Sequence, residues 1–252
     1  MKDFAISLAR EAGTIMRSSF RSGVDRRVKD DGSFVTEVDD RINALVIERV
    51  RERFSDHDVY GEESSSRSGS EYVWVCDPID GTNPFAHNVP TFVFSLALTH
   101  RGVPLLGVIY DPMLERLYVA ERDGPALLND ERISVSQAPS LNGTLVGACM
   151  FHNAHRELSG VIPRLIDARG HVQNYGSIAY MAMLVASGEL SCAIYPGTKG
   201  HDIAAAKIIV ERAGGTVTSF ENADQRYDGR IDGAILSNGR VHDEVLSLTN
   251  KM

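Results

Sequence analysis

Two aspartates, Asp77 and Asp80, stand three residues apart at the end of an apolar run in the segment WVCDPIDGTNPF, residues 74–85. Like charges at this spacing repel each other, and burial at the end of a strand makes the repulsion stronger. The two carboxylates therefore need either a cation or a structural task. One structural explanation is that a strand ends, the chain turns at Pro78, and Asp80 caps a following helix. This explanation leaves Asp77 without a role.

Three other segments carry acidic residues of the same kind. Thr36 and Asp39, in FVTEVDD, have the spacing of a capping box at a helix start. The segment GEE places Glu62 after an apolar DVY run, where a solvated loop explains it equally well. In GHDIAAAKIIVERAGG, Asp202 stands at a predicted helix start, where the helix dipole favours a carboxylate. Each residue alone has an ordinary structural explanation.

The combination points to chemistry. Carboxylates at strand ends or helix starts, each beside small residues, occur at Glu62, Asp77, Asp80 and Asp202. Oxygen ligands without a Cys or His cluster suit Mg²⁺ or Ca²⁺ rather than zinc. The glycine and threonine that follow Asp80 open a helix and offer backbone N–H groups to an anion. This pattern is typical of metal-assisted phosphoryl transfer.

Composition excludes several classes of partner. The 252-residue chain has a formal net charge of −8, from 34 acidic and 26 basic residues, which argues against a nucleic acid polymer and against an anionic membrane surface. No apolar run is long enough to span a bilayer, and the amphipathic start MKDFAISLAREAG does not resemble a signal peptide. Three cysteines without CxxC spacing, at positions 76, 149 and 192, predict buried free thiols in a reducing cytoplasm.

Periodicity predicts the elements of the first half. A helical stripe runs from Phe4 to Phe20, and a second helix fits residues 37–54. The Ser/Gly-rich segment YGEESSSRSGSEY predicts a loop, the most mobile of the chain. Three strand-like runs follow, TFVFSLALTH, PLLGVIYDP and RLYVAERDG, and turns at 101–102 and 111–112 predict that they are antiparallel.

The second half alternates apolar strands with helices near 155–168, 178–187, 202–213 and 241–250. We therefore expect an α+β fold, with an antiparallel sheet in the first half and a mixed sheet with flanking helices in the second. No flexible linker separates the halves. The prediction is one domain over residues 1–252, with halves of approximately 1–138 and 139–252.

The chain resembles the inositol monophosphatase family of Mg²⁺-dependent, lithium-sensitive phosphatases over nearly its whole length. GEE, WVCDPIDGTNPF and HDIAAAKIIVERAGG correspond in order and spacing to three family signatures, and VTEVD matches the helix start upstream. The resemblance implies an αβαβα layered fold, a homodimer, and two or three Mg²⁺ ions. It implies hydrolysis of a small phosphate monoester by metal-activated water, with inositol 1-phosphate as the family's default substrate.

The resemblance also assigns roles to residues. Glu62, Asp77 and the carbonyl of Ile79 would hold one Mg²⁺, with a further, weaker ion near Glu62. A second ion would be held by Asp77, Asp80 and Asp202. Thr82, hydrogen-bonded to Asp39, would orient the attacking water, so the implied catalytic residues are Asp39, Glu62 and Thr82. The implied substrate-binding residues are Gly81, Thr82, Ser177 and Tyr195.

The substrate side departs from the family pattern. Inositol-selective members carry an Arg and a Glu around the sugar hydroxyls, whereas this chain has Gln173 and Tyr195. His201 replaces the usual Trp before the last metal-binding Asp; it either contacts the substrate or packs, and packing is slightly favoured. Lys199 could meet a second anionic group, although a loop lysine is more often solvated. We therefore do not expect a strict inositol phosphatase.

Three alternatives remain open from the sequence. Fructose 1,6-bisphosphate, histidinol phosphate and phosphoadenosine phosphate are substrates of relatives. A haloacid-dehalogenase-type phosphatase is suggested by IDGT, but that mechanism needs aspartates two apart, and Asp77 and Asp80 are three apart. A non-catalytic binding protein with the same fold would be expected to have lost a metal ligand, and none is lost here.

Overall fold

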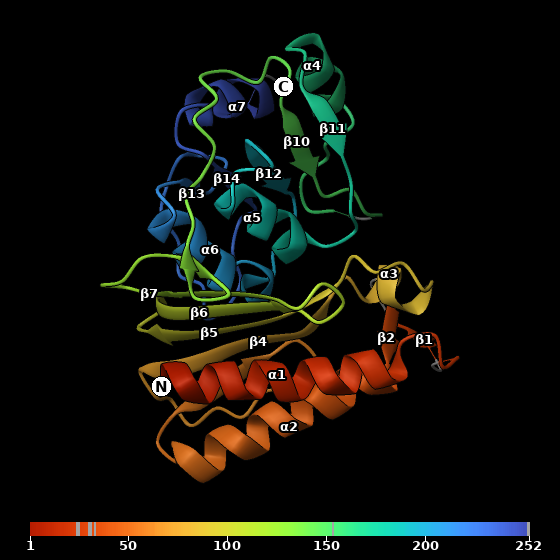
Figure 1. Cartoon of the computed structure of the whole chain (residues 1–252), viewed down its shortest axis with the longest axis vertical. Coiled ribbons are helices and arrows are strands. Elements are labelled where there is room, and N and C mark those ends of the chain that lie inside the picture. Colours follow the sequence, from red (N-terminus) through yellow and green to blue (C-terminus); the bar gives the residue numbers. More distant parts are fainter. Residues whose placement is uncertain (24–25, 30–31, 33, 153, 251–252) are drawn as a thin grey trace.

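Helices and sheets alternate in layers. A computed structural model describes residues 1–23, 26–29, 32, 34–152 and 154–250. From bottom to top, Figure 1 shows a helix pair, a sheet, a second helix pair, a second sheet and a third pair of helices. The helices are α1 (Lys2–Ser19), α2 (Glu37–Arg53), α3 (Thr82–Ala86), α4 (Val161–Asp167), α5 (Ile178–Ala186), α6 (Ala204–Arg212) and α7 (His242–Thr249). The αβαβα layering is confirmed.

The lower sheet has seven strands in sequence order. They are β3 (Asp58–Gly61), β4 (Tyr72–Asp80), β5 (Val93–His100), β6 (Val103–Asp111), β7 (Arg116–Glu121), β8 (Leu127–Leu128) and β9 (Glu131–Arg132). From β4 to β9, each strand is antiparallel to the next, as predicted. The all-antiparallel prediction is wrong at the edge, because β3 runs parallel to β4. The loop 62–71 carries the chain back along the sheet between them, as a parallel pair requires.

The upper sheet is mixed, as predicted. Its order is β11 (His171–Gln173), β10 (Leu145–Ala148), β12 (Cys192–Tyr195), β14 (Ala234–Ser237) and β13 (Thr216–Thr218). The β10 strand is parallel to both neighbours, whereas β14 is antiparallel to both of its own. A separate two-stranded antiparallel sheet joins β1 (Arg26–Val28) to β2 (Phe34–Thr36).

The first two helices follow their apolar stripes. Leu8, Ala12 and Met16 are buried on α1, which packs against β5 and β6. Helix α2 begins after Thr36, and the predicted capping box is present: the Thr36 backbone N–H donates to Asp39, and the Val38 N–H donates to the Thr36 hydroxyl. Together these helices cover the lower face of the lower sheet.

Two helices of the second half are shorter than predicted. Helix α4 begins at Val161 rather than near residue 155, and α6 begins at Ala204 rather than at Asp202. Asp202 instead ends a 3₁₀ turn, η1 (Gly200–Asp202), whose tighter hydrogen bonding turns the chain before the α-helix. The apolar pattern predicted where these helices lie but not where their first turns begin.

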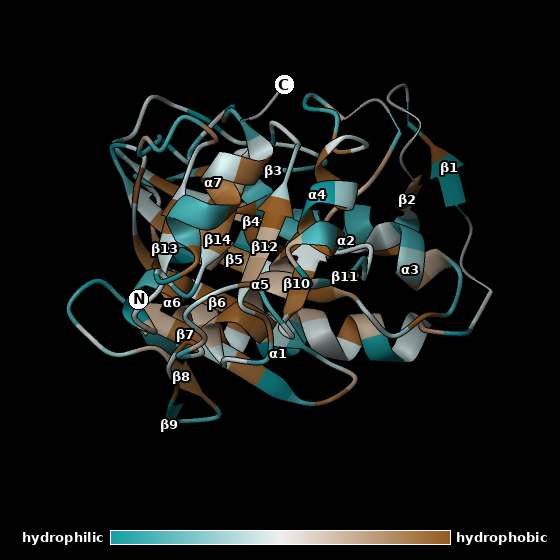
Figure 2. Cartoon of the chain, turned by 90° about the horizontal axis from the view of Figure 1, so that it is seen from above, coloured by the Kyte–Doolittle hydropathy of each residue, from teal (hydrophilic) through white to brown (hydrophobic). Residues whose placement is uncertain are grey.

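Apolar side chains on both faces of β4 explain the continuous run before Asp77. Val73 and Val75 join the core shared with α5 and α6, whereas Trp74 and Cys76 face α1 and α2. A strand covered on both faces has no polar face, so its sequence lacks alternation. Figure 2 shows brown, apolar strands in the interior and teal segments toward the rim. None of the helices in the described ranges combines the length and hydrophobicity needed to cross a bilayer.

Candidate active site

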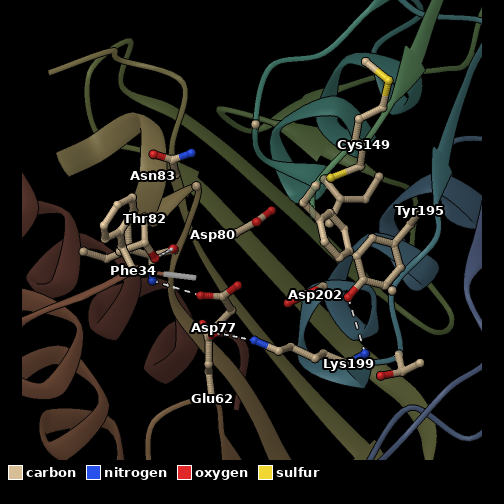
Figure 3. A pocket seen from close by; sticks show the side chains of 18 of the residues that line it. Phe34, Glu62, Asp77, Asp80, Thr82, Asn83, Cys149, Tyr195, Lys199 and Asp202 are labelled. Carbon is tan, nitrogen blue, oxygen red and sulfur yellow. Dashed lines mark hydrogen bonds and ion pairs between the residues drawn. The ribbon is translucent and has the colours of Figure 1, made fainter. Parts of the chain in front are cut away.

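A cavity of about 610 Å³ brings both halves of the chain together. Its lining includes Glu62, Asp77 and residues 79–83 from the first half, with residues 149–152, 155, 195, 197–199, 202 and 230 from the second. Figure 3 shows the carboxylates of Asp77, Asp80 and Asp202 turned toward this space, with Glu62 and Thr82 beside them. The acidic residues singled out in the sequence therefore share one site.

The end of β4 bends where the two aspartates stand. The pairing of β4 with β5 shifts register between Asp77 and Asp80, and the Ile79 backbone N–H donates to Asp77 Oδ1 at 3.0 Å. Asp80 does not cap the following helix, which corrects the capping interpretation. The N-cap is Gly81, with a φ of +98°, and a Cβ there would lie 2.7 Å from the Thr91 carbonyl oxygen. Only glycine fits this turn.

Asp80 takes its hydrogen bonds from the second half of the chain. The Ser177 hydroxyl donates to Asp80 Oδ2 at 2.8 Å, and the Ala179 backbone N–H donates to the same oxygen. Ser177 is also the N-cap of α5, because its oxygen accepts the Tyr180 N–H at 3.0 Å. Ser177, expected on the substrate side, therefore contacts a predicted metal ligand and is not among the lining residues.

Asp202 is supported by Tyr195. The buried Tyr195 hydroxyl donates to Asp202 Oδ2, and its ring forms part of the cavity wall. His201 is buried, with its ring centroid 5.6 Å from that of Tyr60 and its Nε2 3.3 Å from Asp202 Oδ1. It is absent from the cavity lining, so the interpretation of His201 as a packing residue agrees with its position. Gln173 lies on β11, also away from the lining.

Glu62 stands between two lysines. Lys29 Nζ lies 3.0 Å and Lys199 Nζ 2.9 Å from Glu62 Oε1. Burial alone would raise the pKa of Glu62, but His201, Lys199 and Lys29 outweigh it and lower this pKa to about 2. Lys29 also bonds Glu63 at 2.6 Å. Glu62 is thus the carboxylate of the cavity that carries its charge most readily.

The three aspartates behave in the opposite way. Burial first, and then the charges of Glu62, Asp80 and Asp202, raise the pKa of Asp77 well above its usual value. Burial and the neighbouring Asp202 raise the pKa of Asp80 to about 8, although the bonds from Ala179 and Ser177 oppose the shift. Burial also raises the pKa of Asp202. The cluster holds more negative charge than the protein around it can neutralise.

The hydroxyl of Thr82 connects this cluster to Asp39. Thr82 Oγ1 lies 3.0 Å from Asp39 Oδ1 and 2.9 Å from the Ile79 carbonyl oxygen, so either can accept its proton. Asp39 is fully buried, and its other oxygen accepts the Thr36 N–H at 2.9 Å. Burial raises the pKa of Asp39 to about 7 against these hydrogen bonds from Thr36. The hydrogen bond between Thr82 and Asp39 that the resemblance implied is present.

The donor set fits a hard divalent cation. Its side chains offer only oxygen, and the mutual repulsion of Asp77, Asp80 and Asp202 is the field that such an ion would relieve. In the part of the chain that the structure describes, no three His, Cys, Asp or Glu side chains are already grouped around one point as ligands. The oxygen ligands and the negative charge of the cluster therefore favour a metal ion, whereas the positions of the side chains do not yet form a complete ligand set.

Comparison with known proteins identifies the relatives of this chain. The model of the inositol monophosphatase family matches residues 1–251. The chain belongs to the inositol monophosphatase family. The resemblance to this family that the sequence motifs predicted is thereby confirmed over the whole chain. Named relatives of the chain include phosphatases, which supports the prediction that the protein is a hydrolase.

Two relatives and two solved structures show the range of this family. The chain is 33% identical to "Fructose-1,6-bisphosphatase/inositol-1-monophosphatase" of Thermotoga maritima, over 99% of this chain and 96% of the relative. It is 30% identical to "Nus factor SuhB" of Escherichia coli K12, over 87% and 85%. The solved IMPase of Thermotoga maritima matches with a TM-score of 0.89 at 31% identity, covering 99% and 96%. The suhB protein of Bartonella henselae, at 24% identity, shares the fold with a TM-score of 0.92 over 99% and 98%.

Several cavity residues were missing from the sequence analysis. Phe151 and Met150 are exposed apolar residues of the lining, and Phe151 packs against Tyr195 with ring centroids 6.4 Å apart. Arg230 and His155 also line the cavity, from loops without a motif. The three cysteines are free and buried, as predicted, and Cys149 is part of the cavity wall. No local pattern marks such residues, because they come to the site only through the packing of the two halves.

Proposed function

We propose that this protein is a Mg²⁺-dependent phosphatase that hydrolyses a small phosphate monoester. The observation that supports it most is the Thr82–Asp39 hydrogen bond beside a buried, oxygen-only carboxylate cluster on one cavity. Hydrolysis forms a bond from the water oxygen to phosphorus and breaks the ester P–O bond, and the leaving alcohol takes up a proton. The membership of the family, whose named relatives include phosphatases, favours the same reaction.

The residues that would hold two or three Mg²⁺ ions are Glu62, Asp77, Asp80, Asp202 and, through its carbonyl, Ile79. When bound, Mg²⁺ supplies positive charge to the phosphoryl oxygens and lowers the pKa of water. Ser177 and Tyr195 would keep Asp80 and Asp202 oriented through their hydroxyl groups.

Thr82 and Asp39 would place the attacking water. When the Thr82 hydroxyl donates its proton to Asp39, its lone pairs can accept a hydrogen bond from water and fix its direction. Gly81 and Thr82, which line the cavity, would offer backbone N–H groups to the phosphate. Glu62, which carries its charge readily, would complete the catalytic group. Tyr195 would contribute its ring to the wall beside the leaving group.

The first test is a phosphate-release assay with and without Mg²⁺, on a panel of inositol, sugar, nucleotide and amino-alcohol phosphates. We expect turnover with Mg²⁺ and none in EDTA, and inhibition by millimolar lithium as the family resemblance implies. Full activity in EDTA would contradict the proposal. A trapped aspartyl-phosphate would favour the haloacid-dehalogenase-type mechanism instead.

The substrate is expected to extend beyond inositol 1-phosphate. Gln173 and Tyr195 are neutral, and the Tyr195 hydroxyl is already engaged with Asp202, so neither repeats the ion pair of inositol-selective relatives. We expect kcat/KM for at least one other monoester, such as fructose 1,6-bisphosphate, to equal or exceed that for inositol 1-phosphate. A preference for inositol 1-phosphate above about a hundredfold over every other compound would contradict this expectation.

Assembly and location follow from the family resemblance and from composition. We propose a homodimer that acts in the cytoplasm on a small molecule, without a nucleic acid polymer or a membrane as partner. The net charge of −8 supports the last point. Light scattering and a salt-dependent nucleic acid binding assay would check the two parts separately. A monomer, or nanomolar binding to RNA, would contradict the corresponding part.

A further inference from the structure

Ser95 is a polar residue in the middle of β5, a strand that is otherwise apolar on this face. Its side chain is buried, and its Oγ has no hydrogen-bond partner in the described ranges. On the same face, Val93 and Ala97 join the core that is shared with α5 and α6. A buried hydroxyl without a partner costs free energy that an apolar side chain of the same size does not cost. The presence of serine at this position therefore needs an explanation.

The register of the lower sheet places Ser95 directly opposite Asp77. Strand β5 pairs with β4 on one side, where Ser95 faces Asp77, and with β6 on the other, where it faces Ile109. Directly opposite side chains of an antiparallel pair leave from the same face, with Cβ atoms about 4.5–5.5 Å apart. A hydroxyl and a carboxylate can bridge this separation when they turn toward each other. Of the two cross-strand neighbours of Ser95, only Asp77 can accept its proton.

The other two aspartates of the cluster already receive a hydroxyl from a different element. Asp80 accepts the Ser177 hydroxyl at 2.8 Å. Asp202 accepts the hydroxyl of Tyr195. Within the part of the chain that the structure describes, Asp77 accepts only one backbone N–H, at 3.0 Å and through Oδ1. Its other oxygen thus lacks the kind of donor that Asp80 and Asp202 have.

Ser95 lies behind Asp77 rather than in the cavity. Asp77 belongs to the cavity lining, whereas Ser95 is absent from it. A hydroxyl at this position can reach the carboxylate of Asp77 but not a substrate. Ser95 can therefore affect the chemistry of the site only through Asp77.

We propose that Ser95 is a positioning residue for Asp77, because its hydroxyl donates to the carboxylate oxygen that Ile79 leaves free and so holds Asp77 for a divalent cation. This rests on the proposed metal-dependent function and adds to it a residue outside the acidic motifs. A hydrogen bond to the charged carboxylate stabilises the form that binds a metal ion. It also fixes the direction of the carboxylate, as donors behind a metal ligand commonly do.

Titration calorimetry with Mg²⁺ tests this role without requiring turnover. We expect Ser95→Ala to bind Mg²⁺ about tenfold more weakly than the wild-type protein, as for other groups that orient a ligand. In a phosphate-release assay, the Mg²⁺ concentration that gives half-maximal activity should rise by a similar factor. The value of kcat at saturating Mg²⁺ should change little, because Ser95 does not touch the substrate.

Thr99→Val is the matched control. Thr99 is also buried on β5, but its hydroxyl donates to the Val73 carbonyl oxygen at 3.1 Å. Loss of this structural bond should make the metal-free protein less stable and leave the Mg²⁺ affinity unchanged. Ser95→Ala should show the opposite pattern, with weaker Mg²⁺ binding and a metal-free protein at least as stable as wild type. Urea denaturation in EDTA measures both stabilities.

The outcomes separate this inference from the proposed reaction. Weaker Mg²⁺ binding by Ser95→Ala, without a loss of stability in EDTA, would support it even if no monoester were hydrolysed. Equal Mg²⁺ affinities for wild type and Ser95→Ala would overturn it, even in an active Mg²⁺-dependent phosphatase. A clear loss of stability in EDTA would also overturn it, since Ser95 would then be a structural residue. A wild-type protein that binds no Mg²⁺ would overturn the inference and the proposed function together.

Discussion

Asp58 and Asp77 are two buried aspartates on neighbouring strands, and the protein treats their charges in opposite ways. Asp58, on β3, accepts the backbone N–H groups of Ser68, Gly69 and Ser70 and the Ser68 hydroxyl, at 2.8 to 3.1 Å. Although burial opposes it, these bonds lower the pKa of Asp58. Asp77, on β4, faces Glu62, Asp80 and Asp202, and burial with these charges raises its pKa.

The difference separates a structural carboxylate, Asp58, from Asp77, which we propose to be a metal ligand. Asp58 has local donors that complete its hydrogen bonding and tie down the loop 62–71, so it needs nothing from outside the protein. Asp77 has one backbone donor, at Ile79, and its neighbours repel it. A buried charge that the protein leaves uncompensated indicates a site for a cation. The predictions below test this contrast, from the largest expected effect to the smallest.

Replacing Asp80 in the carboxylate cluster should affect activity, whereas replacing Asp58 on β3 should affect stability. Asp80→Asn should lower kcat about a thousandfold, or about 4 kcal/mol, because a metal ligand is lost, while the metal-free protein stays folded. Asp58→Asn should leave kcat within about tenfold and lower the free energy of unfolding by about 1–3 kcal/mol. Steady-state kinetics and urea denaturation of both variants measure the two effects. A fully active Asp80→Asn protein would refute the functional assignment of the cluster.

The Thr82–Asp39 pair should act as one unit. Thr82→Ala and Asp39→Asn should each lower kcat about a hundredfold, and the double variant little further, because either change removes the same hydrogen bond. Asp40→Asn, at the exposed neighbouring position on α2, is the control. If Asp39 served only as the partner in the capping box, its loss would cost about 0.5–2 kcal/mol of stability and leave kcat nearly unchanged.

The pH dependence of stability should have opposite signs for Asp39 and Asp58. The pKa of Asp39 is raised to about 7, so its contribution to stability is complete below its unfolded value, 3.8, and is lost as the pH rises through 7. The pKa of Asp58 is lowered, so its contribution is present above the unfolded value and is lost as the pH falls through the folded one.

Urea denaturation in EDTA, at pH values from about 2 to about 8, measures these contributions. Relative to wild type, Asp39→Asn should become more stable as the pH rises from about 4 to about 7, because Asn imitates the protonated carboxyl. Relative to wild type, Asp58→Asn should lose stability as the pH rises toward about 4, and the difference should then stay constant at higher pH. The same pH trend in both variants would show that the two aspartates do not differ as described.

The smallest effect should come from Tyr195. Tyr195→Phe removes the hydroxyl that bonds Asp202 and keeps the ring in the cavity wall. We expect Mg²⁺ affinity to fall about tenfold, as for other groups that orient a ligand, with kcat at saturating Mg²⁺ almost unchanged. Titration calorimetry with Mg²⁺ measures this directly. Tyr195→Ala, which also removes the ring, should in addition change the order of substrate preference.

Local sequence patterns predicted much of the fold and the members of the site. The apolar stripes located α1 and α2, the turn residues Arg101 and Gly102, both with positive φ, marked the β5–β6 hairpin, and Thr36–Asp39 marked a capping box. These features depend on residues a few positions apart, so their physics can be read along the chain. The acidic motifs themselves pointed to a hard cation before any contact was known.

Contacts between distant residues could be established only from the folded chain. Asp80 accepts hydrogen bonds from Ser177 and Ala179, and Lys199 pairs with Glu62, although in both cases the partners belong to different halves of the sequence. The parallel edge strand β3 and the late start of α6 were likewise not predictable. Residue types and spacing determine which groups are available. Packing between distant segments decides which of these groups share a buried space, and hence which charges remain without a partner. The periodicity of the local sequence does not encode this packing.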